Sequence, residues 1–248
     1  MEVLGIDIGG SGIKGAIVNT QTGELMTERH RIETPRPATA ENIGNTIVEM
    51  VNFFEWKGMI GCGFPGLIRH GVVQTAANLH TDWQGVNIDK FLSEKTHLPT
   101  FVINDADAAG VGEIRFGGGK GKNGVLMLIT LGTGIGTALF VNGHLVPNTE
   151  LGHLEFKGGD AELYASDAAR VREDLSWKDW AKRVNEYLIH VESLFSPDLV
   201  VIGGGASKKE DKIFQHFTLK TPVVAATLKN QAGIIGAAYY AAHAERDA

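Results

Sequence analysis

The sequence predicts an α/β protein built from two similar lobes, and two observations support this prediction. Strand-like apolar runs alternate with helical spacing along most of the 248 residues. The run Ile6–Gly9 is echoed by Ile129–Gly132, and each run leads into a glycine-rich turn and a returning strand. This echo indicates an internal duplication of a strand–turn–strand unit. We expect the two lobes to enclose a central cleft, since small molecules usually bind between domains.

The first half begins with two strands, Val3–Ile8 and Ile13–Val18, joined by the turn GGSG. A third strand is expected to run to about Ile32. Apolar residues spaced three and four apart predict a helix over Glu41–Phe54. Four further elements are expected in this half: a buried strand at Met59–Gly63, a helix at Ile88–Thr96, a strand at Thr100–Ile103 and a helix from about Ala106 to Arg115.

The second half restarts after a glycine-rich link at Gly117–Gly124. A strand at Val125–Leu131 leads into GTGIG and a returning strand at Thr137–Val141. Three elements complete the pattern: an amphipathic helix at Trp177–Phe195, a strand at Leu199–Ile202 that ends in GGG, and an Ala-rich closing helix at about 230–244. We therefore expect lobes at 1–115 and 116–248, with the closing helix either in the second lobe or returning to the first.

Composition and charge exclude several classes of protein. The net charge of −6, from 23 basic and 29 acidic residues, argues against a broad nucleic-acid-binding face. No apolar run approaches the roughly 20 residues that span a bilayer, and the N-terminus shows no signal peptide. The lone cysteine, Cys62 in the apolar run MIGCGF, rules out a disulfide framework or thiolate zinc site within one chain. A small core residue in a reducing, cytoplasmic protein is the expectation.

Two glycine motifs are misleading when taken alone. Gly10–Gly15 matches G-x-G-x-x-G, but a strand follows it where a dinucleotide site needs a helix. The segment GGGKGKN at 117–123 lacks the Ser or Thr of a phosphate loop, so we expect a mobile linker.

Glycine-rich hairpin tips can instead bind anions through successive backbone N–H groups. One such tip could equally be an ordinary β-turn. Two tips in matched halves, with a third glycine run after a buried strand, favour a phosphate or nucleotide site. The predicted phosphate-binding positions are Gly9, Gly10, Ser11, Gly12, Gly132, Thr133, Gly134, Gly204 and Gly205.

Six motifs, spread over nearly the whole chain, together resemble the ROK sugar-kinase family. They are DIGGSGIKGAIV, GFPGLI, the ND of VINDADAAG, LGTGIGTA, ELGH and VIGGGAS. The resemblance implies a two-lobed actin-like fold, a duplicated ribonuclease H-like unit with a central cleft. The segments TAAN, ITLGTGIGTA, LVPNTELGHLEF and LFSP are more narrowly similar to the polyphosphate glucokinase branch.

The resemblance implies phosphoryl transfer to the 6-hydroxyl of glucose, from inorganic polyphosphate or from both polyphosphate and ATP. It also implies Mg²⁺ as cofactor, a homodimer, and no nucleic-acid or membrane partner. The alternative is an ATP-dependent ROK hexokinase or amino-sugar kinase. A sugar-responsive repressor of this family would need an N-terminal helix-turn-helix, for which two residues before the first strand leave no room. Retention of Asp105 argues against a catalytically inactive sugar sensor.

Asp105 corresponds to the family's catalytic base, which accepts the proton of the attacking hydroxyl. Its place between a strand and a helix fits that role, although Asn104 or Asp105 could equally be only a helix N-cap. Asp107 is the better capping candidate. By the same resemblance Asp7 orients Mg²⁺ through water, its alternative being a turn-capping role. Lys14 either neutralises phosphate charge or is a solvated surface lysine.

A second group of side chains corresponds to the family's sugar contacts. The expected substrate-binding residues are Asn78, Asn104, Asp105, Glu150, His153 and Glu162. Glu155 is assigned a supporting or surface role. Many family members bind a structural zinc through a C-x-C-G-x-x-G-C segment, which FKGGD replaces here. We therefore expect no structural zinc, a His153 free to bind sugar, and an FKGGD turn that folds Glu162 back.

Two features of the sequence can each be interpreted in more than one way. A polyphosphate groove could be lined by either of two lysine and arginine sets, or both sets could be solvated surface charges. The sets are Lys208, Lys209 and Lys212, and Arg115, Lys120 and Lys122. The apolar stripe of the helix at 177–195 could be core or a dimer seam.

Overall fold

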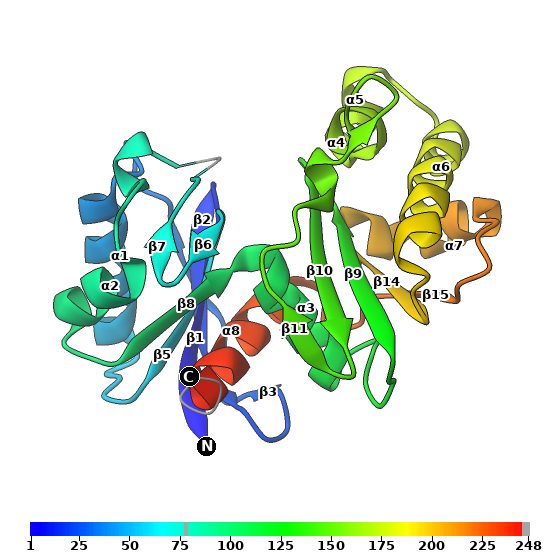
Figure 1. The fold of residues 1–248 in the computed structure, drawn as a ribbon. Helices are drawn as coiled ribbons and strands as arrows, with labels where there is room; N and C mark the ends of the chain where they lie inside the picture. Colours follow the sequence, from blue (N-terminus) through cyan, green and yellow to red (C-terminus); the bar gives the residue numbers. More distant parts are fainter. Residues whose placement is uncertain (77–78, 245–248) are drawn as a thin grey trace. The chain divides into compact units, whose positions relative to one another are not determined.

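The computed structural model describes residues 1–76 and 79–244, which form two compact units (Figure 1). Unit 1 comprises Met1–Gly112 and the chain from Gln231 onward, and unit 2 comprises Glu113–Asn230. The first passage between the units therefore lies inside α3 (Asp105–Phe116). The second lies just before α8 (Ala232–His243).

Unit 1 is built on a mixed sheet with the strand order β3-β2-β1-β5-β8. Its strands are β1 (Glu2–Ile8), β2 (Gly12–Asn19), β3 (Glu24–Leu25), β5 (Ile60–Phe64) and β8 (Thr100–Asn104). β1 is antiparallel to β2 and parallel to β5, which is in turn parallel to β8. The carboxyl ends of β1, β5 and β8 therefore meet at one edge of the sheet.

The third strand expected to reach Ile32 is two short strands instead. β3 pairs with the end of β2, whereas β4 (His30–Glu33) pairs with its beginning. Between them the Thr27 hydroxyl accepts the backbone N–H of Ile17 at 3.1 Å, where a continuous ladder would use a carbonyl. The side chain thus interrupts the strand.

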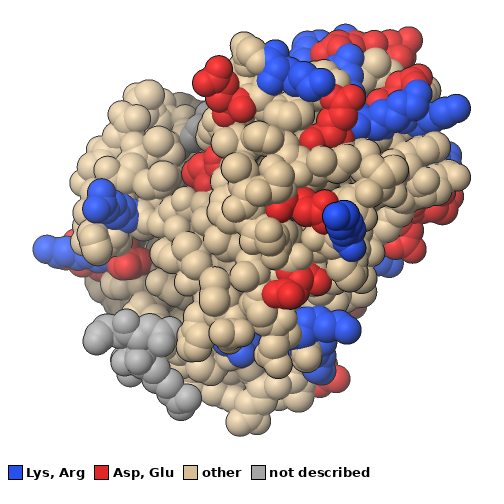
Figure 2. Space-filling model, turned by 45° about the vertical axis from the view of Figure 1, so that its right-hand side comes forward, with Lys and Arg blue, Asp and Glu red and all other residues tan. Residues whose placement is uncertain are grey.

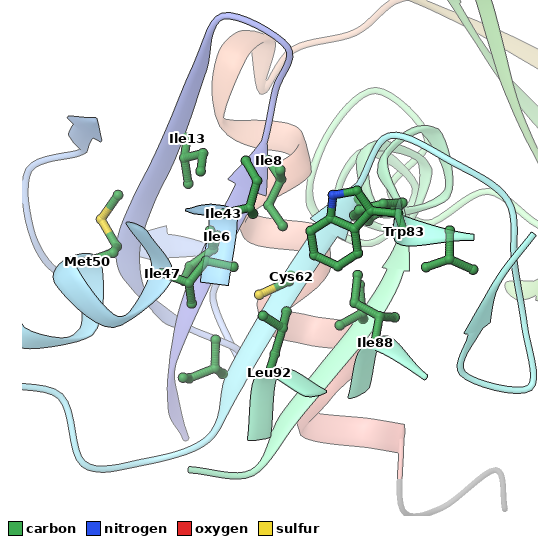
Figure 3. Close-up of a cluster of buried hydrophobic side chains, with 14 of the residues drawn as sticks. Ile6, Ile8, Ile13, Ile43, Ile47, Met50, Cys62, Trp83, Ile88 and Leu92 are labelled. Carbon is green, nitrogen blue, oxygen red and sulfur yellow. The ribbon is translucent and has the colours of Figure 1, made fainter. Parts of the chain in front are cut away.

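Two of the helices expected in the first half are confirmed as α1 (Ala40–Phe53) and α2 (Ile88–Thr96). Each begins at a side-chain N-cap: Thr39 accepts from Asn42 N at 3.2 Å, and Asn87 accepts from Lys90 N at 3.0 Å. Figure 3 shows their apolar faces packed over the sheet, with Cys62 among isoleucine and leucine side chains. Burial raises the pKa of the Cys62 thiol above its ordinary value, as suits a core residue.

The closing helix α8 packs on the sheet at unusually close range (Figure 1). Gly5 of β1 and Gly61 of β5 make this approach possible, because a Cβ on either glycine would overlap a carbonyl group of α8, that of Ile234 or of Ala237. Neither glycine has a positive φ. The need for room beneath α8 therefore explains the two glycines, and a special backbone conformation does not.

Unit 2 repeats the plan of unit 1, with the strand order β11-β10-β9-β14-β15. These strands are β9 (Val125–Leu131), β10 (Ile135–Val141), β11 (His144–Val146), β14 (Leu199–Gly204) and β15 (Val223–Ala225). β9 is antiparallel to β10 and parallel to β14, which is parallel to β15. The order and directions thus match β2-β1-β5-β8.

Several short elements had no clear sequence pattern. They are β6 (Ile68–Arg69), β7 (Val72–Val73), β12 (Glu155–Phe156), β13 (Gly159–Asp160), α4 (Ala161–Ala165), α5 (Asp167–Arg172) and α7 (Glu210–Ile213). The expected amphipathic helix is α6 (Trp177–Phe195). Its apolar stripe, including Trp180, Val184 and Leu188, is buried within unit 2, so these residues are core.

Glu113 is a fully buried carboxylate that ties together the two passages between the units. Its Oε2 accepts backbone N–H groups from Gly118 at 2.9 Å and Thr227 at 3.0 Å. Its Oε1 accepts the N–H of Leu228 at 2.8 Å. The glycine-rich segment after α3, expected to be a mobile linker, is thus held by hydrogen bonds.

We expect Glu113→Gln to lower the free energy of unfolding by about 3 kcal/mol. An amide replaces one acceptor oxygen with a donor and sets it against a buried N–H, which leaves unsatisfied polar groups. Denaturant unfolding of the two proteins measures the difference. Glu94→Gln, on the exposed face of α2, is the control and should stay within about 0.5 kcal/mol of the parent. An equally small change for Glu113→Gln would show that these hydrogen bonds of Glu113 do not stabilise the protein.

Charged side chains of both signs are intermixed on the surface shown in Figure 2. Many are paired, as Lys182 is with Asp179 at 2.9 Å and Arg183 with Glu173 at 2.7 Å. Within the described part of the chain, no helix combines the length and apolar character needed to cross a membrane.

Candidate active site

The carboxyl edge of the unit 1 sheet gathers the predicted catalytic and metal-binding carboxylates. Asp7 of β1 is in register with Gly63 of β5, and Gly63 with Ile103 of β8. Asp105 follows two residues later as the first residue of α3. β1 and β8 are two strands apart, or about 10 Å, and the strand between them carries no side chain at Gly63. The two carboxylates therefore lie at the same edge of the sheet.

The start of α3 is capped by Asn104. Its Oδ1 accepts the N–H groups of Ala106 at 2.8 Å and Asp107 at 3.0 Å, while its Nδ2 donates to the carbonyl of Gly66 at 3.1 Å. The expectation that Asp107 was the better cap is wrong, because Asn104 makes the cap bonds and Asp107 is the third residue of α3, with its side chain buried. Asn104 is also buried, and its amide oxygen already accepts two backbone N–H groups.

Asp105 differs from Asn104 in being half-buried at the helix start. Its Oδ1 accepts the N–H of Ala106 at 2.8 Å. That bond holds the carboxylate at the start of α3. A carboxylate at this edge of the sheet can accept a proton from a bound hydroxyl group.

Asp7 and Lys14 form an ion pair across the first glycine turn, with Nζ and Oδ2 3.1 Å apart. Their side chains are 24% and 27% exposed, so Lys14 is not the freely solvated lysine of one sequence interpretation. Asp7 Oδ1 faces Gly233 in the first turn of α8, where an added Cβ would stay 3.5 Å away. No side chain from that position crowds this oxygen.

The first glycine turn is closed by a bond from Gly9 N to Gly12 O at 3.2 Å. Side chains of the segment after β3 reach its carbonyl groups: Arg31, Thr34 and Arg36. Sequence reasoning missed all three, because only the pairing of β4 with β2 brings them to the turn.

In unit 2, the second and third glycine runs lie side by side. Gly132 N donates to Gly134 O at 3.0 Å to close the second turn, and Thr133 at its tip is exposed. Gly204 is in register with Leu131 at the end of β9, so Gly205 begins beside that turn. Gly204 has a φ of +72°, which favours glycine. The predicted phosphate positions of this unit therefore form one surface.

The FKGGD segment forms a β-hairpin that returns the chain to the second glycine turn. Glu155 pairs with Asp160 across β12 and β13, and the two tip residues, Lys157 and Gly158, have φ of +57° and +87°. Positive φ at both positions is typical of a tight two-residue hairpin turn. Glu162 then follows in the first turn of α4, and its Oε2 accepts the N–H of Ile135 at 3.2 Å.

This return assembles a cluster of three carboxylates around His153. His153 Nδ1 and Asp160 Oδ2 are 2.9 Å apart. The hydrogen bond to Asp160 chiefly raises the pKa of His153, and the charges of Glu162 and Glu150 raise it further, against a smaller effect of burial. Asp160, which sequence reasoning missed, stands at the N-cap position of α4 but makes no cap bond. Its carboxylate holds the imidazole instead.

The hairpin is anchored on α6. The ring of Phe156 lies 5.8 Å from that of Tyr164 and 5.4 Å from that of His190, and Lys157 Nζ lies 2.7 Å from a Glu186 oxygen. An aromatic cluster and an ion pair thus fix the segment that carries Asp160 and Glu162. Across the described residues, no three His, Cys, Asp or Glu side chains are grouped so as to hold a metal ion.

The pairing with Asp160 predicts a pH-dependent contribution to stability. Because the pKa of folded His153 is raised above about 6.5, its contribution is full below pH 6.5 and is lost as the pH rises through the folded value. Asp160→Asn should lower the pKa of His153 and destabilise the protein at pH 5.5 more than at pH 8.5. Ring titration by NMR and unfolding at both pH values measure these effects. Asp174→Asn, at an exposed position of the same unit, should change neither, and an unaltered His153 titration in Asp160→Asn would refute the pairing.

The remaining predicted residues are less closely grouped. Asn78 lies outside the described residues. Glu155 is exposed. Lys208, Lys209 and Lys212 are exposed after the third glycine run, as are Lys120 and Lys122 after α3. Arg115 donates to the carbonyl of Gly143 at 2.9 Å.

Comparison with known proteins shows the family to which this chain belongs. The ROK family model matches residues 3–163. This chain belongs to the ROK family. A polyphosphate glucokinase of Mycobacterium tuberculosis is 48% identical over 236 residues, or 95% of this chain and 89% of that protein.

Two solved structures agree with this assignment. An inorganic polyphosphate/ATP-glucomannokinase from Arthrobacter sp. strain KM has a TM-score of 0.91 and 47% identity, covering 97% of this chain and 98% of that one. A ROK family glucokinase from Streptomyces griseus, in complex with glucose and AMPPNP, has a TM-score of 0.83 and 25% identity over 98% of this chain and all of that one. The expected actin-like sugar-kinase fold is confirmed.

Proposed function

We propose that this ROK protein is a polyphosphate glucokinase, which transfers a phosphoryl group from inorganic polyphosphate to the 6-hydroxyl of glucose. The observation that carries the proposal is the 48% identity, over 95% of the chain, to a polyphosphate glucokinase. The arrangement of Asp7 and Asp105 at one sheet edge beside a glycine turn supports it, because phosphoryl transfer requires alignment and charge neutralisation more than covalent chemistry.

In this proposal Asp105 is the general base. It accepts the proton of the 6-hydroxyl as that oxygen attacks the terminal phosphate, and the bond from Ala106 N orients its carboxylate. A carboxylate at a helix N-terminus is a weak base. A loose transition state tolerates this, because the hydroxyl proton leaves late.

Asp7 is the residue that would hold Mg²⁺, through bound water. Mg²⁺ keeps several waters and needs few carboxylates, which fits a lone, partly exposed aspartate with one oxygen paired to Lys14. The ion would neutralise charge on the transferring phosphate. Lys14 and the N–H groups of the glycine turns would hold the rest of the donor.

Glu150, His153 and Glu162 would bind sugar hydroxyls, and we propose the same role for Asn78, Asn104 and Asp105. Carboxylate and imidazole groups can accept and donate to neighbouring hydroxyls. The cluster around His153 supports this assignment, since Asp160 of the hairpin orients His153, and the N–H of Ile135, beside the second glycine turn, orients Glu162. We also propose that the protein is a homodimer, as the family resemblance implies. We propose that it is cytoplasmic, as its single cysteine suggests.

ATP is the second candidate donor. The relative from Arthrobacter is named for polyphosphate and ATP, and the Streptomyces glucokinase holds AMPPNP. A nucleotide would lie near Gly204 and Gly205, whereas polyphosphate would extend along the lysines that follow them. Lys208→Ala with Lys209→Ala should weaken long-chain polyphosphate use and spare ATP.

A coupled assay for the 6-phosphate product, with each donor on glucose and on mannose, tests the function. We expect turnover of glucose with polyphosphate. Turnover with ATP alone would leave the hexokinase alternative, and no product with either donor would overturn both.

A further inference from the structure

Three side chains of the segment 31–36 donate hydrogen bonds to three successive carbonyl groups of the first glycine turn. Thr34 Oγ1, Arg36 Nη2 and Arg31 Nη2 donate to the carbonyls of the run Gly9–Ser11, in that order along the run, over 2.5, 2.8 and 2.6 Å. Thr34 is buried, whereas both arginines are exposed. We call these three side chains the carbonyl clamp.

The clamp determines where the N–H groups of the turn point. In a planar trans peptide, the C=O and the N–H that follows it point in opposite directions. Drawing the three carbonyls toward Arg31, Thr34 and Arg36 therefore turns the N–H groups of Gly10–Gly12 away from these side chains. A hydrogen bond from a guanidinium group also polarises the peptide and makes its N–H a stronger donor.

Gly12 provides the room for one member of the clamp. A Cβ at this position would come within 2.5 Å of Arg31 Nε and 2.8 Å of its guanidinium carbon. Gly12 does not have a positive φ, so the missing side chain matters for space. The absence of a side chain at Gly12 thus leaves room for the Arg31 guanidinium group beside the turn.

We infer that Arg31, Thr34 and Arg36 are positioning residues for the phosphoryl donor. They act through the N–H groups of the turn, which they hold in the direction of the donor's phosphates, and they do not touch the donor themselves. The inference rests on the proposed function in one respect, that the ligand of the turn is a phosphate chain. Because the clamp acts on the turn, it serves polyphosphate and ATP alike.

Thr34→Val tests the buried member. The change keeps the shape and removes the hydroxyl donor, so the Gly9 carbonyl is released. We expect kcat/KM to fall about tenfold for polyphosphate and for ATP, with the Kd for glucose unchanged. Thr34→Ser should restore most of the activity. Thr46→Val is the matched control, since Thr46 is a buried threonine of α1 that donates to the Asn42 carbonyl at 3.0 Å, and it should leave both donors unaffected.

Arg31→Gln and Arg36→Gln test whether the arginines act through the turn. Each should lower kcat/KM by a similar factor for both donors. A loss confined to long-chain polyphosphate would mean that the arginines contact the chain directly, and would overturn the clamp.

A binding measurement separates this inference from the proposed function. Calorimetry with inorganic tripolyphosphate should show binding by the parent and about tenfold weaker binding by Thr34→Val. Equal binding by the two would overturn the clamp and leave the function intact. If the parent binds tripolyphosphate but phosphorylates no sugar, the proposed function fails and the clamp stands.

Discussion

Asp105→Asn should lower kcat by a factor of about 10² to 10⁴, the usual contribution of a general base, while the Kd for glucose stays within about threefold of the parent value. Asparagine keeps an oxygen that can accept the N–H of Ala106, so the start of α3 should remain folded. It cannot take up the proton of the attacking hydroxyl. A coupled product assay gives kcat, and calorimetry with glucose gives the Kd.

Asp89→Asn is the matched control, at the first turn of the neighbouring helix α2. Asp89 also accepts a backbone N–H, that of Val102 at 2.8 Å, and burial raises its pKa to about 6. The same chemical change at this carboxylate should leave kcat within about twofold. Turnover by Asp105→Asn within tenfold of the parent would show that another group is the base.

Gly61→Ala should lower the free energy of unfolding by about 3 kcal/mol or more. The new Cβ would overlap the Ala237 carbonyl of α8, which is backbone and cannot rotate away. Either α8 must lift from the sheet or the strand must shift, and both changes open the core of unit 1. Denaturant unfolding measures the loss.

Gly63→Ala, two residues along the same strand, is the control for this prediction. A Cβ there would meet Ala108 Cβ at 3.5 Å and Asp105 Cα at 3.6 Å, which is ordinary van der Waals contact. The free energy of unfolding should therefore change by less than about 1 kcal/mol. Equal losses for the two variants would show that glycine is needed for strand conformation and that contact with α8 is not the cause.

The regular elements could be predicted because each has a local signal. Helical spacing marks α1, α2 and α6, and the repeated run before each glycine turn marks the duplicated sheet. The short elements could not be predicted. β3 and β4 are separated by a hydroxyl of Thr27 that replaces a ladder bond, and α4 is only five residues long. Tertiary contacts decide such elements, and local sequence does not reveal them.

The candidate site was predictable where a residue borders a strand end, as Asp7 and Asp105 do. It was not predictable where a role depends on a partner distant in the sequence. Arg31, Thr34 and Arg36 reach the first glycine turn through strand pairing alone, and Asp160 reaches His153 through a hairpin. The N-cap role of Asn104 was one interpretation of the sequence, whereas the bond from its amide nitrogen to the Gly66 carbonyl depends on a partner distant in the chain.

The placement of α8 has a consequence for the order in which the protein is made. Ribosomes synthesise β1 and β5 early, but the helix that covers them follows only after all of unit 2. During synthesis unit 2 can complete its own core first, while the face of the unit 1 sheet that α8 will cover stays exposed to solvent. Unit 1 therefore cannot complete its core until α8 has been made, and α8 must then pack against Gly5 and Gly61.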